Sequence, residues 1–152
     1  MGLEVAIELK IATGGCAPRD YITETGENRL LESMYGLREV TTAELNEYNQ
    51  TTGRYDRYTA RTYINARDSD ATVYFSTDQN SPGSKTTKNG CEMYRKPFVM
   101  NPNIDTLVDF IREHDVHVLN VAGNRASKLA KRDAVNFRTI LKEAIKIVNE
   151  IN

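Results

Sequence analysis

The stretch VLNVAGNRASK, residues 118–128, begins with the apolar and β-branched side chains of a buried strand and ends in a polar turn. Gly123 separates the two halves, and Asn124, Arg125 and Lys128 follow within five residues. Glycine allows close backbone approach, and arginine grips phosphate with two hydrogen bonds. The stretch is typical of a strand-end loop that meets an anion. A simple strand-to-helix connection with solvated cations fits the spacing equally well.

Two similar strand-like stretches precede it, and all three alternate with helical patterns. The earlier strands are predicted at ATVYFS (71–76) and KPFVMN (96–101), and the third is VHVLNVAG (116–123). SPGSKTTKNGCEMYRK (81–96) reads as a turn into a helix, because Pro82 and Gly83 open it. Helical spacing of apolar residues marks 104–114 and a long amphipathic tail from Ser127 onward. This order predicts an α/β fold with a mostly parallel sheet flanked by helices.

The first 70 residues carry weaker patterns. We expect a short helix over residues 3–11, an irregular segment over 14–35 and a short strand over 37–40. Residues 43–48 are weakly helical, TTGRYDRYTA (51–60) is a loop, and ARTYINARD (60–68) fits a short helix. No repeat or linker divides the chain, so its 152 residues are predicted to form a single domain.

Loops beyond the carboxyl ends of parallel strands are where such sheets bind ligands. STDQNSPGSKTT (76–87) occupies the same place after its strand as AGNRASK does after the later one. Both lead into helix N-termini, whose free N–H groups and positive dipole end suit anions. Neither loop matches a Walker A or G-x-G-x-x-G pattern, so the sequence predicts an anion site without naming the ligand.

Composition narrows the class of partner. The formal net charge is −1, with 20 basic and 21 acidic residues, so no overall field favours a nucleic-acid polymer or an anionic membrane. No apolar run approaches the length of a membrane span, and the N-terminus lacks the pattern of a secretion signal. Two isolated cysteines, Cys16 and Cys91, fit a reduced cytoplasmic protein.

Four stretches, in order, carry a resemblance to a known family. They are GGCAP (14–18) with ETGEN (24–28), RTYINARDSDATVYF (61–75), SPGSKTT (81–87) and VLNVAGNRASK (118–128). The chain resembles the molybdenum cofactor carrier proteins, which are Rossmann-like and related to the lysine-decarboxylase-like phosphoribohydrolases. The resemblance implies a Rossmann-like three-layer fold and a homo-oligomer, dimer or tetramer, that holds a phosphorylated pterin-type ligand such as molybdopterin. It also implies that the family's first strand and its Gly-rich loop are missing before residue 3.

Carried over residue by residue, the resemblance implies a set of ligand-binding positions on three segments. They are Arg61, Thr62 and Asn65; Ser81, Gly83, Ser84 and Thr86; and Gly123, Asn124 and Arg125. Small residues and hydroxyls let backbone amides reach phosphate, and arginine neutralises its charge. The related hydrolases carry a catalytic Glu where this chain has Gly90, so we expect binding without catalysis.

Three functions follow from this pattern. The first is a non-catalytic binding protein for a small phosphorylated nucleotide- or pterin-like ligand, resembling the molybdenum cofactor carriers. The second is a protein that sequesters a nucleotide signal, such as a cyclic nucleotide or an ADP-ribose derivative. The third is a degenerate nucleotide phosphoribohydrolase.

Other chemistry-bearing residues have structural explanations beside functional ones. His114 and His117 lack the companions of a metal site, so none is expected. Asp68 and Asp70 could meet a ribose or a metal, or cap the preceding helix. The loop GRYDRYTAR (53–61) could stack its tyrosines on a ring while its arginines hold phosphate, or pack them on the domain. Cys16 could lie near a ligand or be a small buried thiol.

Overall fold

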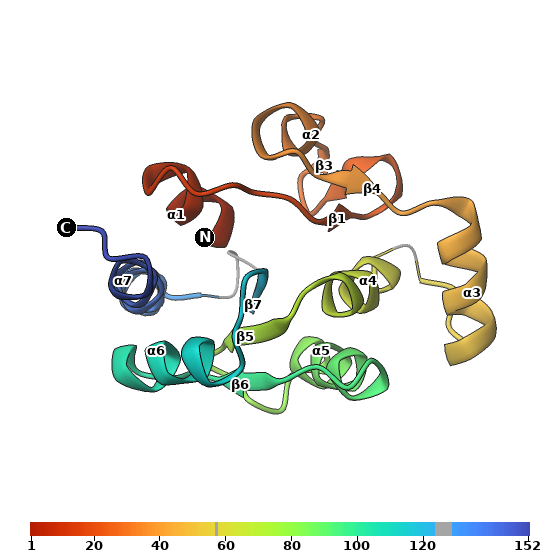
Figure 1. Ribbon diagram of the computed structural model, residues 1–152. Coiled ribbons are helices and arrows are strands. Elements are labelled where there is room, and N and C mark those ends of the chain that lie inside the picture. The colour runs from red at the N-terminus through yellow and green to blue at the C-terminus, as the bar shows by residue number, and fades with distance from the viewer. Residues whose placement is uncertain (57, 124–128) are drawn as a thin grey trace.

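The computed structural model describes residues 1–56, 58–123 and 129–152. Figure 1 shows the arrangement of its helices and strands. The helices are α1 (Gly2–Glu8), η1 (Arg19–Tyr21, a 3-10 turn), α2 (Leu30–Tyr35), α3 (Thr42–Thr52), α4 (Ala60–Asp68), α5 (Pro82–Met93), α6 (Ile104–Glu113) and α7 (Lys131–Val148). The strands are β1 (Cys16–Ala17), β2 (Ile22–Thr23), β3 (Gly26–Glu27), β4 (Arg38–Glu39), β5 (Ala71–Phe75), β6 (Phe98–Met100) and β7 (Leu119–Gly123).

The central sheet is parallel, with the strand order β6-β5-β7. All five residues of β5 are buried, as expected for a strand with neighbours on both sides and helices on both faces. The register pairs Thr72 with Phe98 and Asn120, and Phe75 with Gly123. The carboxyl ends of β5 and β7 therefore lie side by side.

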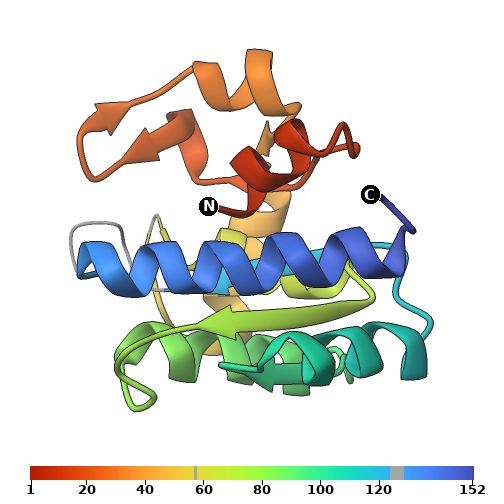
Figure 2. The ribbon, with the colours of Figure 1, turned by 90° about the vertical axis from the view of Figure 1, so that its left-hand side faces the viewer.

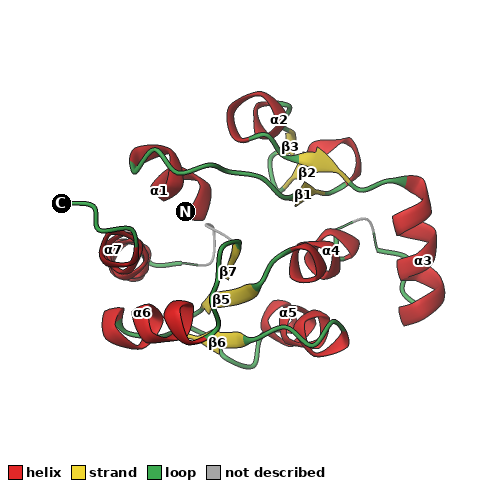
Figure 3. Ribbon diagram, in the orientation of Figure 1, coloured by secondary structure: helices red, strands yellow, loops and turns green. Residues whose placement is uncertain are grey.

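Helices cover both faces of this sheet, which makes three layers. In Figure 1, α6 and α7 lie on one side of the strands, and α4 and α5 lie on the other; Figure 3 shows the same layers by element type. Val73 and Phe75 point into the core under α6 and α7, where the Phe75 ring lies 5.2 Å from that of Phe137. Because side chains alternate along a strand, Thr72 and Tyr74 face α5 instead.

The segment from α1 to β4 lies beyond the β7 edge of the sheet, as Figures 1 and 2 show. It holds the parallel pair β1–β4 and the hairpin β2–β3. Glu8 at the end of α1 forms ion pairs with Arg138 and Lys142 of α7. Gly2 lies so close to β7 that an added Cβ would be 2.8 Å from Cβ of Val121.

The predicted parallel sheet with flanking helices is confirmed. The three predicted strands are each found within three residues of the expected bounds, and the helix over 60–68 has the bounds expected. The weakly helical residues 43–48 lie within a longer helix, α3, whose start is fixed by a capping box between Thr41 and Glu44. The first helix ends earlier than expected, at Glu8, and the last begins at Lys131.

The expectation of an irregular segment over 14–35 was wrong in part. It contains α2 and three strands of two residues each. Strands this short carry no periodic pattern that a sequence could display. Helix α2 has only six residues and ends at Gly36, which adopts the left-handed conformation with φ 66°.

Candidate functional site

The phenol of Tyr74 lies at the N-terminus of α5, beside the carboxyl end of β5. Its side chain is 3% exposed, and its hydroxyl is within hydrogen-bonding reach of the Ser81 side chain. A Cβ added to Gly83 would lie 3.1 Å from the Tyr74 hydroxyl oxygen. The hydroxyl therefore lies beside the first turn of α5, and a side chain at position 83 would push against it.

The start of α5 is ordered by the serines of the SPGS turn. Ser81 is the N-cap and accepts a hydrogen bond from the Ser84 amide at 3.2 Å, and Pro82 follows at the first helical position. The buried Ser84 hydroxyl donates to the carbonyls of Gln79 and Ser81 at 2.8 and 2.9 Å. The Thr86 hydroxyl donates to the Pro82 carbonyl at 2.9 Å. Among the described residues, these two hydroxyls thus bond to backbone carbonyls and fix the shape of the turn. The Gly83 amide lies in the first turn of the helix.

Arg61 brings a positive charge to the same place. It lies in the first turn of α4, and its charge acts on the Tyr74 phenol. Burial raises the pKa of Tyr74, and this effect outweighs the opposing hydrogen bond from Ser81 and the charge of Arg61. The phenol therefore stays protonated at neutral pH and can donate a hydrogen bond to an anion.

Gly123 is required by the close approach of β7 to β5. A Cβ at this position would lie 2.4 Å from the carbonyl oxygen of Phe75, a distance that real structures do not allow. The glycine thus lets the two strands stay paired to their ends. Asn124 and Arg125, which the sequence places in the same site, lie outside the described residues.

Asn65 and Thr62 lie in α4 and not in the SPGS turn at the start of α5. The Asn65 amide accepts a hydrogen bond from the Cys16 amide at 2.7 Å and donates to the Cys16 carbonyl at 3.0 Å. Both groups of its side chain therefore dock β1 onto α4. Thr62 lies in the first turn of α4, half-buried, with its N–H bonded to the Thr59 carbonyl. A ligand contact by either residue stays a prediction.

A second asparagine, Asn101, clamps the end of β5 in the same way. Its amide accepts from the Ser76 amide at 2.8 Å and donates to the Ser76 carbonyl at 2.7 Å. Its own backbone is left-handed, with φ 48°, and its N–H bonds to the Tyr74 carbonyl. Sequence reasoning missed both Asn101 and Tyr74. The available signals were an asparagine directly after a strand and a polar-tipped aromatic near the end of a buried one.

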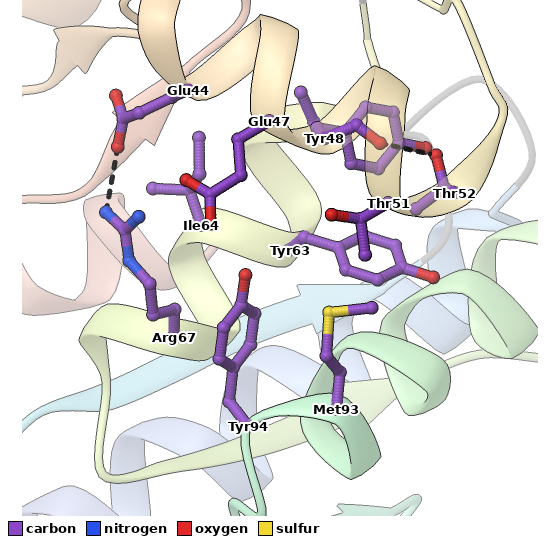
Figure 4. A pocket seen from close by; sticks show the side chains of 11 residues that line it. Glu44, Glu47, Tyr48, Thr51, Thr52, Tyr63, Ile64, Arg67, Met93 and Tyr94 are labelled. Carbon is purple, nitrogen blue, oxygen red and sulfur yellow. Dashed lines mark hydrogen bonds and ion pairs between the residues drawn. The ribbon is translucent and has the colours of Figure 1, made fainter.

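A small cavity lies between α3, α4 and α5, and Figure 4 shows its lining. Tyr48 and Tyr63 meet edge to face with their ring centres 5.2 Å apart. The cavity has a volume of about 20 Å³, which is enough for about one water molecule. The buried Tyr48 hydroxyl has no hydrogen-bond partner among the described residues. The cavity is too small for a nucleotide or a pterin.

The tyrosines in and just after the loop 53–61 do not gather around one site. Tyr55 and Tyr58 of the loop are 81% and 43% exposed, whereas Tyr63, which follows in α4, is 9% exposed and belongs to the core. Arg54 donates to the Thr86 hydroxyl at 3.5 Å, so this loop does reach the start of α5.

An ion-pair network closes one end of the small cavity. Glu44 accepts from Arg38 at 2.7 and 2.9 Å and from Arg67 at 2.8 Å. These bonds hold the pKa of Glu44 well below its ordinary value. Burial raises the pKa of the neighbouring Cys16 thiol to about 11, so it stays protonated and unreactive.

The remaining polar candidates have structural partners. Asp70 accepts hydrogen bonds from the amides of His117 and Val118 at 3.0 and 2.8 Å and so fixes the approach to β7. Asp68 pairs with Arg67 and Arg38. Within the described ranges, no three His, Cys, Asp or Glu side chains are grouped to hold a metal ion. The helices of those ranges include none with the length and apolarity of a membrane span.

Comparison with known proteins places this arrangement in a family. A solved structure from Syntrophus aciditrophicus SB, provisionally assigned as a molybdenum carrier protein, matches 96% of this chain and 84% of its own. The two are 26% identical and superpose with a TM-score of 0.65, in agreement with the expected Rossmann-like fold. No curated protein matches the chain. The model of the circularly permuted YpsA SLOG family matches residues 1–145, so the chain belongs to that family.

Proposed function

We propose that the protein binds a small phosphorylated ligand of the nucleotide or pterin type at the carboxyl edge of its sheet and does not transform it. One observation carries the proposal: the buried Tyr74 hydroxyl lies at the N-terminus of α5, and the charge of Arg61 acts on the same phenol. A phenol and a helix start donate hydrogen bonds, and a guanidinium neutralises charge, which is what a phosphate needs.

The family of this chain and the similar solved structure support the proposed type of ligand. That protein is provisionally assigned as a molybdenum carrier, so a molybdopterin is the leading candidate for the natural ligand, and GMP serves as a phosphorylated probe of the site. The described residues offer donors for its phosphate and no cluster of metal-binding side chains. Recognition is therefore proposed to act on the organic, phosphorylated part of this cargo. Loop residues Asn124 and Arg125 belong to the proposal through the family resemblance alone.

Gly90 supports binding without catalysis. It is buried in α5 against α4, and an added Cβ would lie 3.4 Å from Cα of Tyr63 and 3.5 Å from Cβ of Ala66. A methyl group fits this space, but the longer side chain of a glutamate would have to displace α4. The position where related hydrolases carry their carboxylate thus serves helix packing here. Incubation with nucleoside monophosphates should release no free base, and a released base would refute this part of the proposal.

Ligand identity and affinity provide the direct test. Native mass spectrometry of the purified protein should show a retained molybdopterin or nucleotide; a cyclic nucleotide or ADP-ribose mass would point to sequestration of a signal instead. Size-exclusion chromatography with light scattering checks the homo-oligomer that the family implies.

Titration calorimetry with GMP then tests how much the individual site residues contribute to the affinity. Loss of the Arg61 charge in Arg61→Ala should weaken binding by about 10- to 150-fold, equivalent to roughly 1.5–3 kcal/mol. Tyr74→Phe removes only the hydroxyl and should weaken binding about tenfold. Tyr94→Phe, at the small cavity, is the matched control and should change nothing. Unchanged affinity in both site variants would remove this edge as the binding site.

A further inference from the structure

A second and larger cleft lies between α5 and the edge strand β6. Its volume is about 420 Å³, within the range of small-molecule sites of roughly 300–1,000 Å³. Lys85 and Lys88 of α5 and Phe98 and Met100 of β6 line it, with Ser84 of the SPGS turn and Gln79 and Asn80 of the preceding loop. The residues that carry the phosphate-site argument, Arg61, Tyr74, Ser81 and Gly83, do not line it.

The floor of the cleft is apolar because of the strand register. Phe98 pairs with Thr72 and Met100 with Tyr74, so both side chains point to the face of the sheet that α5 covers. Strand β6 is the edge of the sheet, and α5 covers this face only in part, which leaves both residues half-buried. The Phe98 ring lies 6.3 Å from the Tyr74 ring, which supports it from the sheet side. An aromatic ring beside a thioether is a suitable surface for a flat, apolar group.

The wall of the cleft is positive. Lys85 and Lys88 are three residues apart in α5 and therefore lie on neighbouring positions of one helix face. Both are exposed, and no carboxylate among the described residues forms an ion pair with either. Two like charges at this spacing repel each other, and an anion placed between them would relieve the repulsion. Gln79 and Asn80 add amide groups at the mouth.

We infer that this cleft is a second ligand site, which takes a small organic anion with a flat apolar body. The body lies on Phe98 and Met100, and the anionic group meets Lys85 and Lys88. The site adjoins the proposed phosphate site, because Ser84 of the SPGS turn lines the cleft and the Phe98 ring lies beside Tyr74. Its floor and wall, Phe98, Met100, Lys85 and Lys88, are not residues of the phosphate site.

The test uses 1-anilinonaphthalene-8-sulfonate, whose naphthalene ring and sulfonate match the floor and the wall. Its titration into the intact protein is followed by fluorescence, and its place by amide shifts in ¹⁵N-labelled protein. We expect one bound molecule per chain and shifts centred on residues 79–80, 85–88 and 98–100. K85A/K88A should weaken binding at least tenfold, and K85E/K88E more.

The matched control R112A/K146A removes the same number of charges from α6 and α7, on the opposite face of the sheet, and should leave the affinity within twofold. Arg61→Ala should also leave it within twofold, and K85A/K88A should leave GMP binding within twofold, so this site and the phosphate site can fail separately. Absence of 1:1 binding, shifts centred elsewhere, or equal affinity in K85A/K88A would overturn the inference.

Discussion

Replacing Glu44 by Gln should destabilise the protein through the loss of one buried charge. Glu44 lies in the first turn of α3, with its side chain 14% exposed. It accepts two hydrogen bonds from Arg38, one from Arg67 and one, at 3.1 Å, from the backbone of Thr41. Glutamine keeps the shape of the side chain but replaces a charged acceptor with a neutral amide, which can accept at only one of its two positions.

The size of the effect follows from these partners. Hydrogen bonds to charged groups contribute roughly 1.5–3 kcal/mol each when shielded from water. Arg38 is 47% exposed, so its two bonds are largely screened by solvent, and the better shielded Arg67 bond and the cap count most. We expect a loss of about 2 kcal/mol in the free energy of unfolding at pH 7. For a chain of this size that corresponds to a melting temperature lower by about 4–8 °C.

The lowered pKa of Glu44 determines how this loss of stability changes with pH. The pKa of Glu44 is held well below its ordinary value of 4.5 in the folded protein. The stabilisation is therefore complete above about pH 4.5 and is lost as the pH falls through the lower folded pKa. The difference between the wild type and Glu44→Gln should be constant from pH 6 to 8 and should shrink below pH 4.5.

Urea unfolding followed by circular dichroism at several pH values measures the difference. Glu47→Gln, on the same helix, is the control, because Glu47 forms no ion pair among the described residues; it should cost less than 0.5 kcal/mol. If Glu44→Gln costs no more than the control at pH 7, or if the difference grows on acidification, the network does not stabilise the fold as argued.

Four further substitutions, at three positions, test the packing around the site. Gly123→Ala should cost about 2–3 kcal/mol in urea unfolding, because the new Cβ would lie 2.4 Å from the Phe75 carbonyl oxygen; a neutral effect would mean that the strands are not held this close. Asn65→Leu should cost about 2 kcal/mol and speed hydrogen exchange at the Cys16 amide, since both hydrogen bonds to Cys16 are lost; unchanged exchange there would contradict the clamp. Gly90→Ala should be neutral or stabilising by up to about 1 kcal/mol, whereas Gly90→Glu should cost about 2 kcal/mol or more, and equal stabilities would show that α4 does not restrict this position.

The second half of the fold could be predicted from the sequence because its elements have clear periods. Ile104, Leu107, Val108 and Ile111 recur at helical spacing, and three of the four are buried in α6. The β5 stretch is rich in β-branched and aromatic residues and is buried throughout. The segment 14–35 has no such pattern, because its strands are two residues long and are held by tertiary contacts. The side-chain amide that fixes β1 belongs to Asn65, which lies 49 positions further along the chain than Cys16.

Two loops at the ends of β5 and β7 were expected to carry the ligand, and a ligand there stays a prediction. The start of α5 lies at the carboxyl edge of the sheet, as the order of the elements indicated, and the loop after β7 lies outside the described residues. Tyr74 was missed because an aromatic residue in a buried strand reads as core until the position of its hydroxyl is known. Ser84 and Thr86 were predicted to lie in a phosphate-contacting turn, and a ligand contact by either stays a prediction. Among the described residues their hydroxyls bond to backbone carbonyls, which spacing alone does not reveal.

A crystal structure of the protein with GMP tests the central claim most directly. The account predicts that the phosphate lies at the carboxyl edge of the sheet, accepts hydrogen bonds from the Tyr74 hydroxyl and the Gly83 amide, and pairs with Arg61. A phosphate bound away from the start of α5, or a Tyr74 hydroxyl that turns away from it, would contradict the account.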